Sequence, residues 1–169
     1  MLRRKKGATI VELLISTIIL VMACMGIGAL ISHAARGWSS GTSSDYATTT
    51  ATLALQKLCC DIRDARSAAV TSGTLTVTFP NKLVDQGTGE VIYDSSTNST
   101  TTRSYYLLNG KLMRYVGGAT SVFADRISSA TFGASGGTVN VTLTADEHVG
   151  TSTSQQQVTG RISLRNFRS

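Results

Sequence analysis

An apolar run near the N-terminus, ATIVELLISTIILVMACMGIGALI, constrains this chain more than any other feature. It covers residues 8–31 and contains one charged side chain, Glu12. A helix of this length is about 36 Å long, and the hydrocarbon core of a bilayer is about 30 Å thick. We therefore predict an apolar transmembrane helix over residues 8–34.

The charges that flank this run indicate how the chain is oriented. Four basic residues, Arg3 to Lys6, precede it, and basic residues beside a membrane helix stay on the cytoplasmic side. Trp38 would then lie at the opposite interface. We expect residues 35–169 to form a domain outside the cytoplasm.

The charge balance argues against a nucleic-acid-binding surface. The formal net charge is +6, with 16 Lys and Arg against 10 Asp and Glu, and four of the basic residues precede the apolar run. The rest of the chain therefore has 12 basic against 10 acidic residues, a net charge of +2. No basic stripe remains that would bind a phosphate backbone.

Two simple alternatives compete for the N-terminus. A secretory signal peptide has an apolar region of about 7–15 residues and a small-residue cleavage site, and SHAA at residues 32–35 could serve as that site. The run of residues 8–31 is longer than such a region. A plain single-pass anchor fits the length, but it offers nothing to offset the cost of a carboxylate in lipid.

The stretch RRKKGATIVELL resembles the class III signal of type IV prepilins and pseudopilins. In that superfamily a short basic leader and a glycine precede an apolar helix whose fifth residue is glutamate. The resemblance implies that residues 1–7 are a leader and that prepilin peptidase cuts between Gly7 and Ala8. It also implies N-methylation of the new amino terminus on Ala8, where most members have phenylalanine or methionine.

The resemblance gives Glu12 a role in assembly. It implies that the Glu12 carboxylate meets the N-terminal amine of a neighbouring subunit in a filament. The physics agrees, because two buried opposite charges are tolerated when they are paired and costly when they are apart.

The resemblance also implies a function. The order of segments after residue 103 looks like that of J-type minor pseudopilins of type II secretion systems. We therefore expect a structural subunit at or near the tip of a pseudopilus, inserted in the bacterial inner membrane with its C-terminal domain in the periplasm. Expected partners are sibling pilin or pseudopilin subunits, prepilin peptidase and a secreted substrate. The sequence does not say which apparatus, siblings or substrate these are.

Two other functions stay open. One is a minor pilin of a type IV pilus that serves adhesion, motility or DNA uptake, and only the DNA-uptake case would involve nucleic acid. The other is an anchored periplasmic binding domain that never polymerises.

The body of the chain predicts an α+β fold of pilin type, in which a long helix precedes an antiparallel sheet. Apolar residues at spacings of three and four predict an amphipathic helix over residues 45–69, with Asp45 as its cap. We expect it to continue the membrane helix, with a kink near Gly37 to Gly41. The residues of its apolar face are Leu55, Leu58, Ile62, Ala65 and Ala69.

Alternating patterns predict the strands of the sheet. Asn109-Gly110, between two apolar runs in residues 103–116, is typical of a hairpin with a type I′ turn. The Gly-, Ser- and Thr-rich stretches 80–102 and 145–157 are predicted as loops, with a short strand at 90–93. The other predicted strands are 74–79, 138–144 and 158–167.

No pattern in the sequence predicts catalysis, a metal site or a cofactor. His33 and His148 belong to no metal-binding motif, and Cys24, Cys59 and Cys60 have no zinc or redox spacing. Packing is the favoured role for Cys59 and Cys60. Residues 85–90, DQGTGE, could bind calcium but lack the full ligand pattern, so we predict a turn there and a protein that is not an enzyme.

Overall fold

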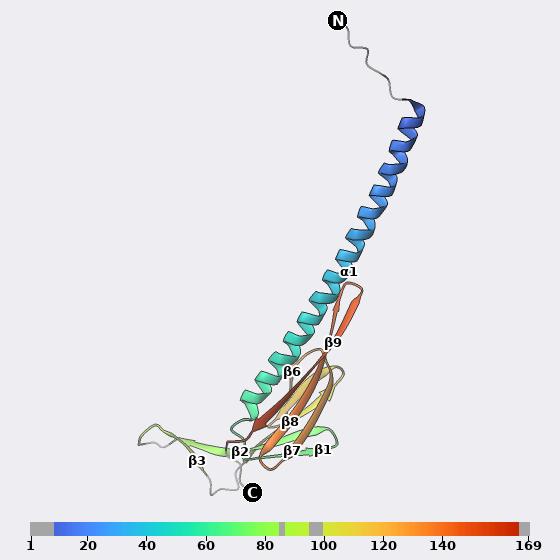
Figure 1. Ribbon diagram of the computed structural model, residues 1–169. Helices are drawn as coiled ribbons and strands as arrows, with labels where there is room; N and C mark the ends of the chain where they lie inside the picture. Colours follow the sequence, from blue (N-terminus) through green and yellow to red (C-terminus); the bar gives the residue numbers. More distant parts are fainter. Residues whose placement is uncertain (1–8, 85–86, 95–99, 166–169) are drawn as a thin grey trace.

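The computed structural model describes residues 9–84, 87–94 and 100–165. It confirms the predicted α+β class. One long helix, α1 (Ile10–Ile62), precedes nine strands in the part of the chain that is described. Figure 1 shows the strands gathered around the C-terminal end of α1, while the N-terminal half of the helix projects away from them.

Helix α1 is uninterrupted. It contains 53 residues and is therefore about 80 Å long, and it curves gently without a sharp kink (Figure 1). The predicted kink near Gly37 to Gly41 is therefore wrong. A glycine costs a helix only about 1 kcal/mol, and neighbouring contacts hold this segment: Ser39 Oγ donates to Val149 O at 2.5 Å, and Gln156 Nε2 donates to Ser44 Oγ at 3.0 Å.

Both predicted limits of the amphipathic segment are also wrong. Asp45 is an exposed residue in the middle of α1 and caps nothing. The helix ends at Ile62 rather than continuing to Ala69, because the backbone after it joins a sheet. Arg66 N donates to Thr78 O at 2.8 Å, and Ala69 lies exposed in a strand.

The larger sheet is antiparallel and has six strands in the order β1-β2-β4-β5-β6, with β3 paired to the far part of β2. Asn109 and Gly110 have φ angles of 49° and 72°. These values confirm the predicted type I′ turn between β4 and β5. The strands are β1 (Ser67–Thr71), β2 (Thr74–Val84), β3 (Val91–Asp94), β4 (Thr100–Leu108), β5 (Lys111–Val116) and β6 (Ala119–Ala124).

Some of the predicted loop 80–102 is strand. β2 runs on to Val84 and β4 begins at Thr100, so the loop prediction is wrong at both ends. The short strand predicted at 90–93 is confirmed as β3. The backbone groups of this part of β2 are hydrogen-bonded to the strands on either side. The polar side chains of the stretch give no sign of this pairing in the sequence.

The smaller sheet has three antiparallel strands, β7 (Ile127–Ser135), β8 (Thr138–Val149) and β9 (Ser152–Ser163). β8 and β9 pair over their whole length, from Thr138 and Ser163 to Val149 and Ser152. The prediction that 145–157 is a loop is therefore wrong. The last strand starts earlier than predicted and ends at Ser163, and residues 166 and 167 of that prediction lie outside the described residues.

The core lies between the C-terminal half of α1 and the two sheets. Gly160 on β9 marks the closest approach, because a Cβ there would lie 2.8 Å from Leu55 Cδ2. A larger residue at this position would require the Leu55 side chain to move for the strand to pack against the helix. The fully buried apolar residues include Leu58 and Ile62 of α1, Leu75, Val77, Tyr105 and Leu112 of the larger sheet, and Val139, Val141 and Leu143 of β8.

Candidate assembly helix

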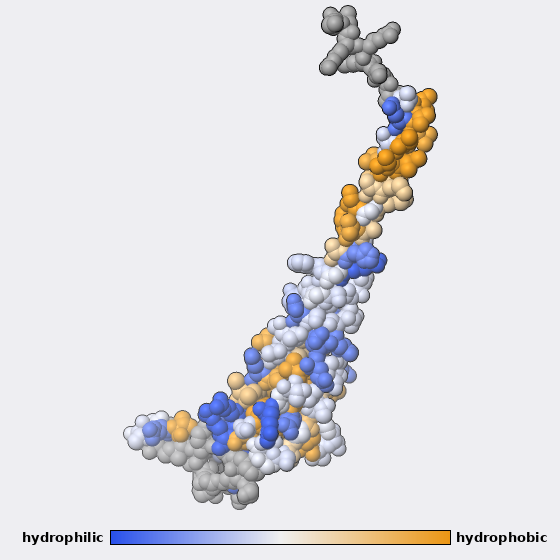
Figure 2. Space-filling view, viewed as in Figure 1, coloured by the Kyte–Doolittle hydropathy of each residue, from blue (hydrophilic) through white to orange (hydrophobic). Residues whose placement is uncertain are grey.

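The N-terminal part of α1 has no cover within the chain. We call residues 10–31 the apolar half of the helix. All of its residues are exposed, with Ile10, Met25 and Leu30 between 71% and 85% exposed, and Figure 2 shows it as an almost continuous hydrophobic surface. The helix is long and apolar enough to cross a membrane once.

Hydroxyl groups in the apolar half are satisfied by the helix itself. Ser16 Oγ donates to Glu12 O at 2.7 Å, and Thr17 Oγ1 donates to Leu14 O at 2.8 Å. Such bonds to the preceding turn make a hydroxyl tolerable in lipid. Glu12 is the one charged side chain of this segment. The role of the segment therefore depends on the contacts of Glu12.

Glu12 caps the start of its own helix. Thr9 is the N-cap, and its Oγ1 accepts a hydrogen bond from Glu12 N at 3.3 Å. In return, Glu12 Oε2 accepts from Thr9 N at 2.9 Å and from Thr9 Oγ1 at 3.2 Å. This is a capping box, which satisfies donors that the first helical turn leaves free. The sequence analysis missed it, although Thr-x-x-Glu before an apolar run is its signature.

The capping box uses only one of the two Glu12 oxygens. Oε2 makes every bond of this carboxylate within the described residues, and no described donor reaches Oε1. A carboxylate can accept about four hydrogen bonds. With respect to the described residues, the side chain therefore keeps acceptor capacity that a cationic group could use.

Gly7 and Ala8, the predicted cleavage site, lie outside the described residues, as do Arg3 to Lys6. Cleavage between Gly7 and Ala8 and methylation of Ala8 stay predictions. Thr9 and Glu12 follow the predicted cut, so cleavage there would leave the whole capping box in the mature chain.

The C-terminal half of α1 has two distinct faces. One face is a buried stripe whose members recur every three or four residues: Ser43, Ala47, Ala51, Ala54, Leu58 and Ile62. The opposite face carries what we call the outer stripe, Tyr46, Leu53 and Cys60, at intervals of seven residues, which is close to two turns. Tyr46 and Leu53 are 58% and 59% exposed, so apolar surface continues beyond the membrane segment.

A polar cluster fixes the end of α1 against the larger sheet. The Asp61 carboxylate pairs with Arg103, accepts from Tyr105 Oη at 2.7 Å and accepts from Arg114 Nη1 at 3.2 Å. Burial, followed by the hydrogen bond to Asp61, raises the pKa of Tyr105 well above its usual range. Arg103 also stacks over the Phe79 ring, with Cζ 4.4 Å from the ring centre.

A second buried carboxylate ties β8 to the helix and to the start of β7. Glu147 is 4% exposed and accepts from Arg126 Nη1 at 2.5 Å and from Thr50 Oγ1 at 3.3 Å. The hydrogen bond to Glu147 raises the pKa of Arg126. Neither acidic cluster was predicted from the sequence, since their members lie far apart along the chain.

The remaining predicted candidates are scattered. Cys59 is partly buried and packs against the core, but Cys60 is exposed, so the packing role predicted for Cys60 is wrong. His33 and His148 are both exposed. Across residues 9–84, 87–94 and 100–165, no three His, Cys, Asp or Glu side chains form a group that could hold a metal. Asp85 of the 85–90 loop lies outside these ranges.

No family model, curated protein or solved structure matches this chain. The layout of a long N-terminal apolar helix followed by antiparallel sheets is compatible with a pilin-like architecture.

Proposed function

We propose that this chain is a structural subunit of a pilin-type filament, a minor pseudopilin of type II secretion or a closely related minor pilin. The observation that carries the proposal is the apolar half of α1, which is exposed on every side and bears one carboxylate. Prepilin peptidase would cut between Gly7 and Ala8, and the mature subunit would assemble through this helix.

The Glu12 oxygen Oε1, which no described donor reaches, supports the pairing role. The charged N-terminal amine created on Ala8 of a neighbouring subunit can donate to Oε1 while Oε2 stays in the capping box. Each charge then offsets the other's cost in an apolar bundle. The outer stripe extends the contact surface, because it lets neighbouring helices pack beyond the membrane with apolar residues at a heptad spacing.

A single-pass anchored domain that does not polymerise is the second candidate, and the capping box favours it. The box gives Glu12 an intramolecular role that an isolated anchor would also need. An assembling subunit therefore requires the charge of Glu12, whereas an anchored domain requires only its hydrogen bonds.

Processing gives the first test. Mass spectrometry of protein purified from its host membrane should show the loss of residues 1–7 and one added methyl group on Ala8. An intact N-terminus at Met1 would favour the anchored domain, and an N-terminus near residue 35 would favour a secretory signal peptide.

Glu12 variants give the sharper test, because glutamine keeps a capping box while it removes the charge. We expect Glu12→Gln and Glu12→Ala to be processed normally but recovered poorly with sibling subunits after crosslinking in membranes. Loss of one member of a buried pair costs about 3–5 kcal/mol, or more than a hundredfold in contact population. If Glu12→Gln assembles normally and only Glu12→Ala fails, capping rather than pairing explains Glu12.

A further inference from the structure

A cationic pocket lies at the end of the molecule that is farthest from the apolar half. It has a volume of about 320 Å³ and lies where α1 and β9 end. Three arginines line it, Arg63, Arg161 and Arg165, together with Ile162 and Leu164. Figure 2 shows strongly hydrophilic side chains at this end of the helix, next to apolar surface.

The backbone brings the three arginines together. Arg161 and Arg165 share the exposed face of the last stretch of chain, where exposed and buried residues alternate from 161 to 165. Arg63 is the C-cap of α1, and its carbonyl accepts a hydrogen bond from Arg165 N at 2.9 Å. The positions of Arg63 and Arg165 are therefore fixed relative to each other by main-chain contacts.

These arginines differ from the others that join the helix and sheets. Arg103, Arg114 and Arg126 each pair with a carboxylate of this chain. Within residues 9–84, 87–94 and 100–165, Arg63, Arg161 and Arg165 form no ion pair with a carboxylate, and no carboxylate of these residues lines their pocket. Like charges gathered in this way repel one another, and an anionic partner would relieve that repulsion.

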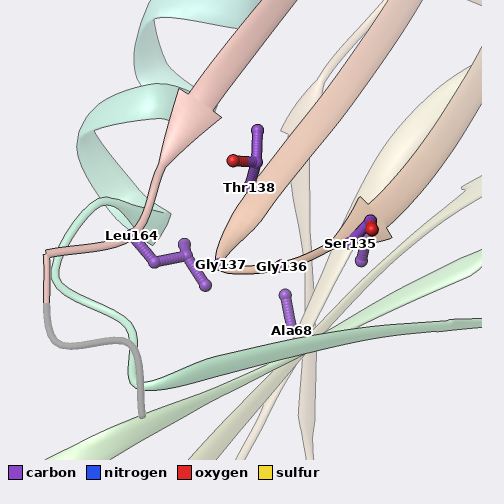
Figure 3. A pocket seen from close by; sticks show the side chains of 7 residues that line it. Ala68, Ser135, Gly136, Gly137, Thr138 and Leu164 are labelled. Atoms are coloured by element: carbon purple, nitrogen blue, oxygen red, sulfur yellow. The ribbon is translucent and has the colours of Figure 1, made fainter. Parts of the chain in front are cut away.

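A neighbouring pocket provides a contrast. It has a volume of about 180 Å³, shares Leu164 with the arginine pocket and is lined otherwise by small residues of the β7–β8 turn and β1. Figure 3 shows Leu164 to the left of the Gly136-Gly137 turn and Ala68 below the turn. None of its lining residues is charged, so the positive charge is particular to the arginine pocket.

We propose that the arginine pocket binds an acidic segment of another polypeptide. Guanidinium groups form paired hydrogen bonds with carboxylates, and Arg161 and Arg165 lie on the exposed face of this stretch, where such carboxylates can reach them. The C-terminal end of a helix carries partial negative charge, so an anion of any kind is disfavoured close to the helix backbone and favoured at the outer ends of the guanidinium groups. Carboxylates spaced along a peptide can meet each arginine at the rim.

The anchoring membrane cannot supply the anion. Arg63 lies 32 residues after Ile31 in one continuous helix, which places it about 48 Å from the end of the apolar half along the helix axis. The proposal does not depend on whether the chain polymerises, since a periplasmic binding domain could use the same pocket.

The test uses the full chain in nanodiscs of neutral lipid and a fluorescent hexaglutamate peptide, with hexaglutamine as the uncharged probe. Fluorescence anisotropy should show binding of hexaglutamate alone. The double variant Arg161→Gln/Arg165→Gln should weaken it by about tenfold or more, as expected for the loss of charge-assisted hydrogen bonds. Arg161→Lys/Arg165→Lys keeps the charge but loses the paired geometry, so it should weaken binding less.

The matched control is Arg36→Gln/Lys111→Gln, which removes the same charge away from the pocket and should bind as the wild type does. The basic residues before the apolar run attract the probe equally in every variant. Circular dichroism melting should show that all variants are folded. Equal weakening in the control, no weakening in the pocket variants, or displacement of the peptide by equimolar inorganic phosphate would each overturn the proposal.

Discussion

The two halves of helix α1 meet their surroundings in opposite ways. In the apolar half every residue is exposed, and apolar side chains point in all directions around the axis. In the C-terminal half, buried residues form one narrow stripe, and most other positions are polar. One helix therefore combines a segment that needs an external apolar partner with a segment whose partner is its own sheet.

The buried stripe is built largely from small residues. Ala47, Ala51 and Ala54 are followed by the larger Leu58 and Ile62 toward the end of the helix, and the helix packs against β8 and β9. The apolar half has large branched residues at all angles instead, as a helix needs when lipid or other helices surround it.

The two carboxylates near the ends of α1 differ in the same way. Asp61 receives donors from Arg103, Tyr105 and Arg114. Within the described residues, the Glu12 carboxylate bonds only in its own capping box, and no described donor reaches its second oxygen. The charge at the sheet end is paired with arginines of the chain, whereas within the described residues the charge in the apolar half has no ion-pair partner.

The largest expected effect comes from matched leucines in the two halves. Leu58 is fully buried and Leu20 is 63% exposed. Leu58→Ala should reduce the free energy of unfolding of the domain by about 2–5 kcal/mol, because it leaves a cavity in the core. Leu20→Ala should leave it unchanged. Thermal unfolding of the full chain in detergent, followed by the strand signal in circular dichroism, measures both, and equal effects would contradict the division into halves.

A smaller effect is expected at the Asp61 cluster. Tyr105→Phe should cost about 1.5 kcal/mol at neutral pH, the value of a hydrogen bond to a charged group. The exposed Tyr115→Phe should cost little. The cost of Tyr105→Phe is measured from denaturant unfolding of both variants beside the wild type.

The pH dependence of this cost follows from the raised pKa of Tyr105. A pKa raised in the folded state means that folding favours the neutral phenol. Its contribution is fully present below the unfolded pKa of about 10 and is lost as the pH rises further. The difference between wild type and Tyr105→Phe should therefore shrink above pH 10, and a constant difference would show that folding does not raise the pKa of Tyr105.

The smallest effect is expected at the helix start. Thr9→Ala removes the N-cap, which is worth about 1 kcal/mol, and should speed hydrogen exchange at the Glu12 amide roughly fivefold. The melting temperature of the domain should not change, since the two halves are separate. Thr17→Ala, within the helix, is the control, and unchanged exchange at Glu12 would mean that the box does not form in the membrane.

Sequence reasoning predicted the elements whose signals are local. The apolar run predicted the helix. Asn109-Gly110 predicted the hairpin, because only a few residue pairs reach positive φ at two successive positions. The β8–β9 extension was missed because its inward residues include Ser154 and Gln156, which pack against a helix without an apolar alternation. The early end of α1 was missed because β1 forms a tight hairpin with β2 across Ser72-Gly73, whose φ angles are 49° and 77°, and this pairing overrides the helical pattern of residues 63–69.

The candidate site was predicted in part. The position of Glu12 in the apolar helix was evident from the sequence, but its capping box was overlooked although Thr-x-x-Glu signals it. The clusters around Asp61 and Glu147 could not be predicted, because each joins segments more than 40 residues apart along the chain. The division of the strands into two sheets depends on the same kind of contact.

The continuity of α1 also has a mechanical consequence. A helix of about 80 Å without a break acts as a stiff lever, so a tilt of about 10° in the membrane would move its far end by roughly 14 Å. Small motions of the embedded segment are thereby converted into large displacements of the strands, and a force on the strands is returned to the membrane as torque.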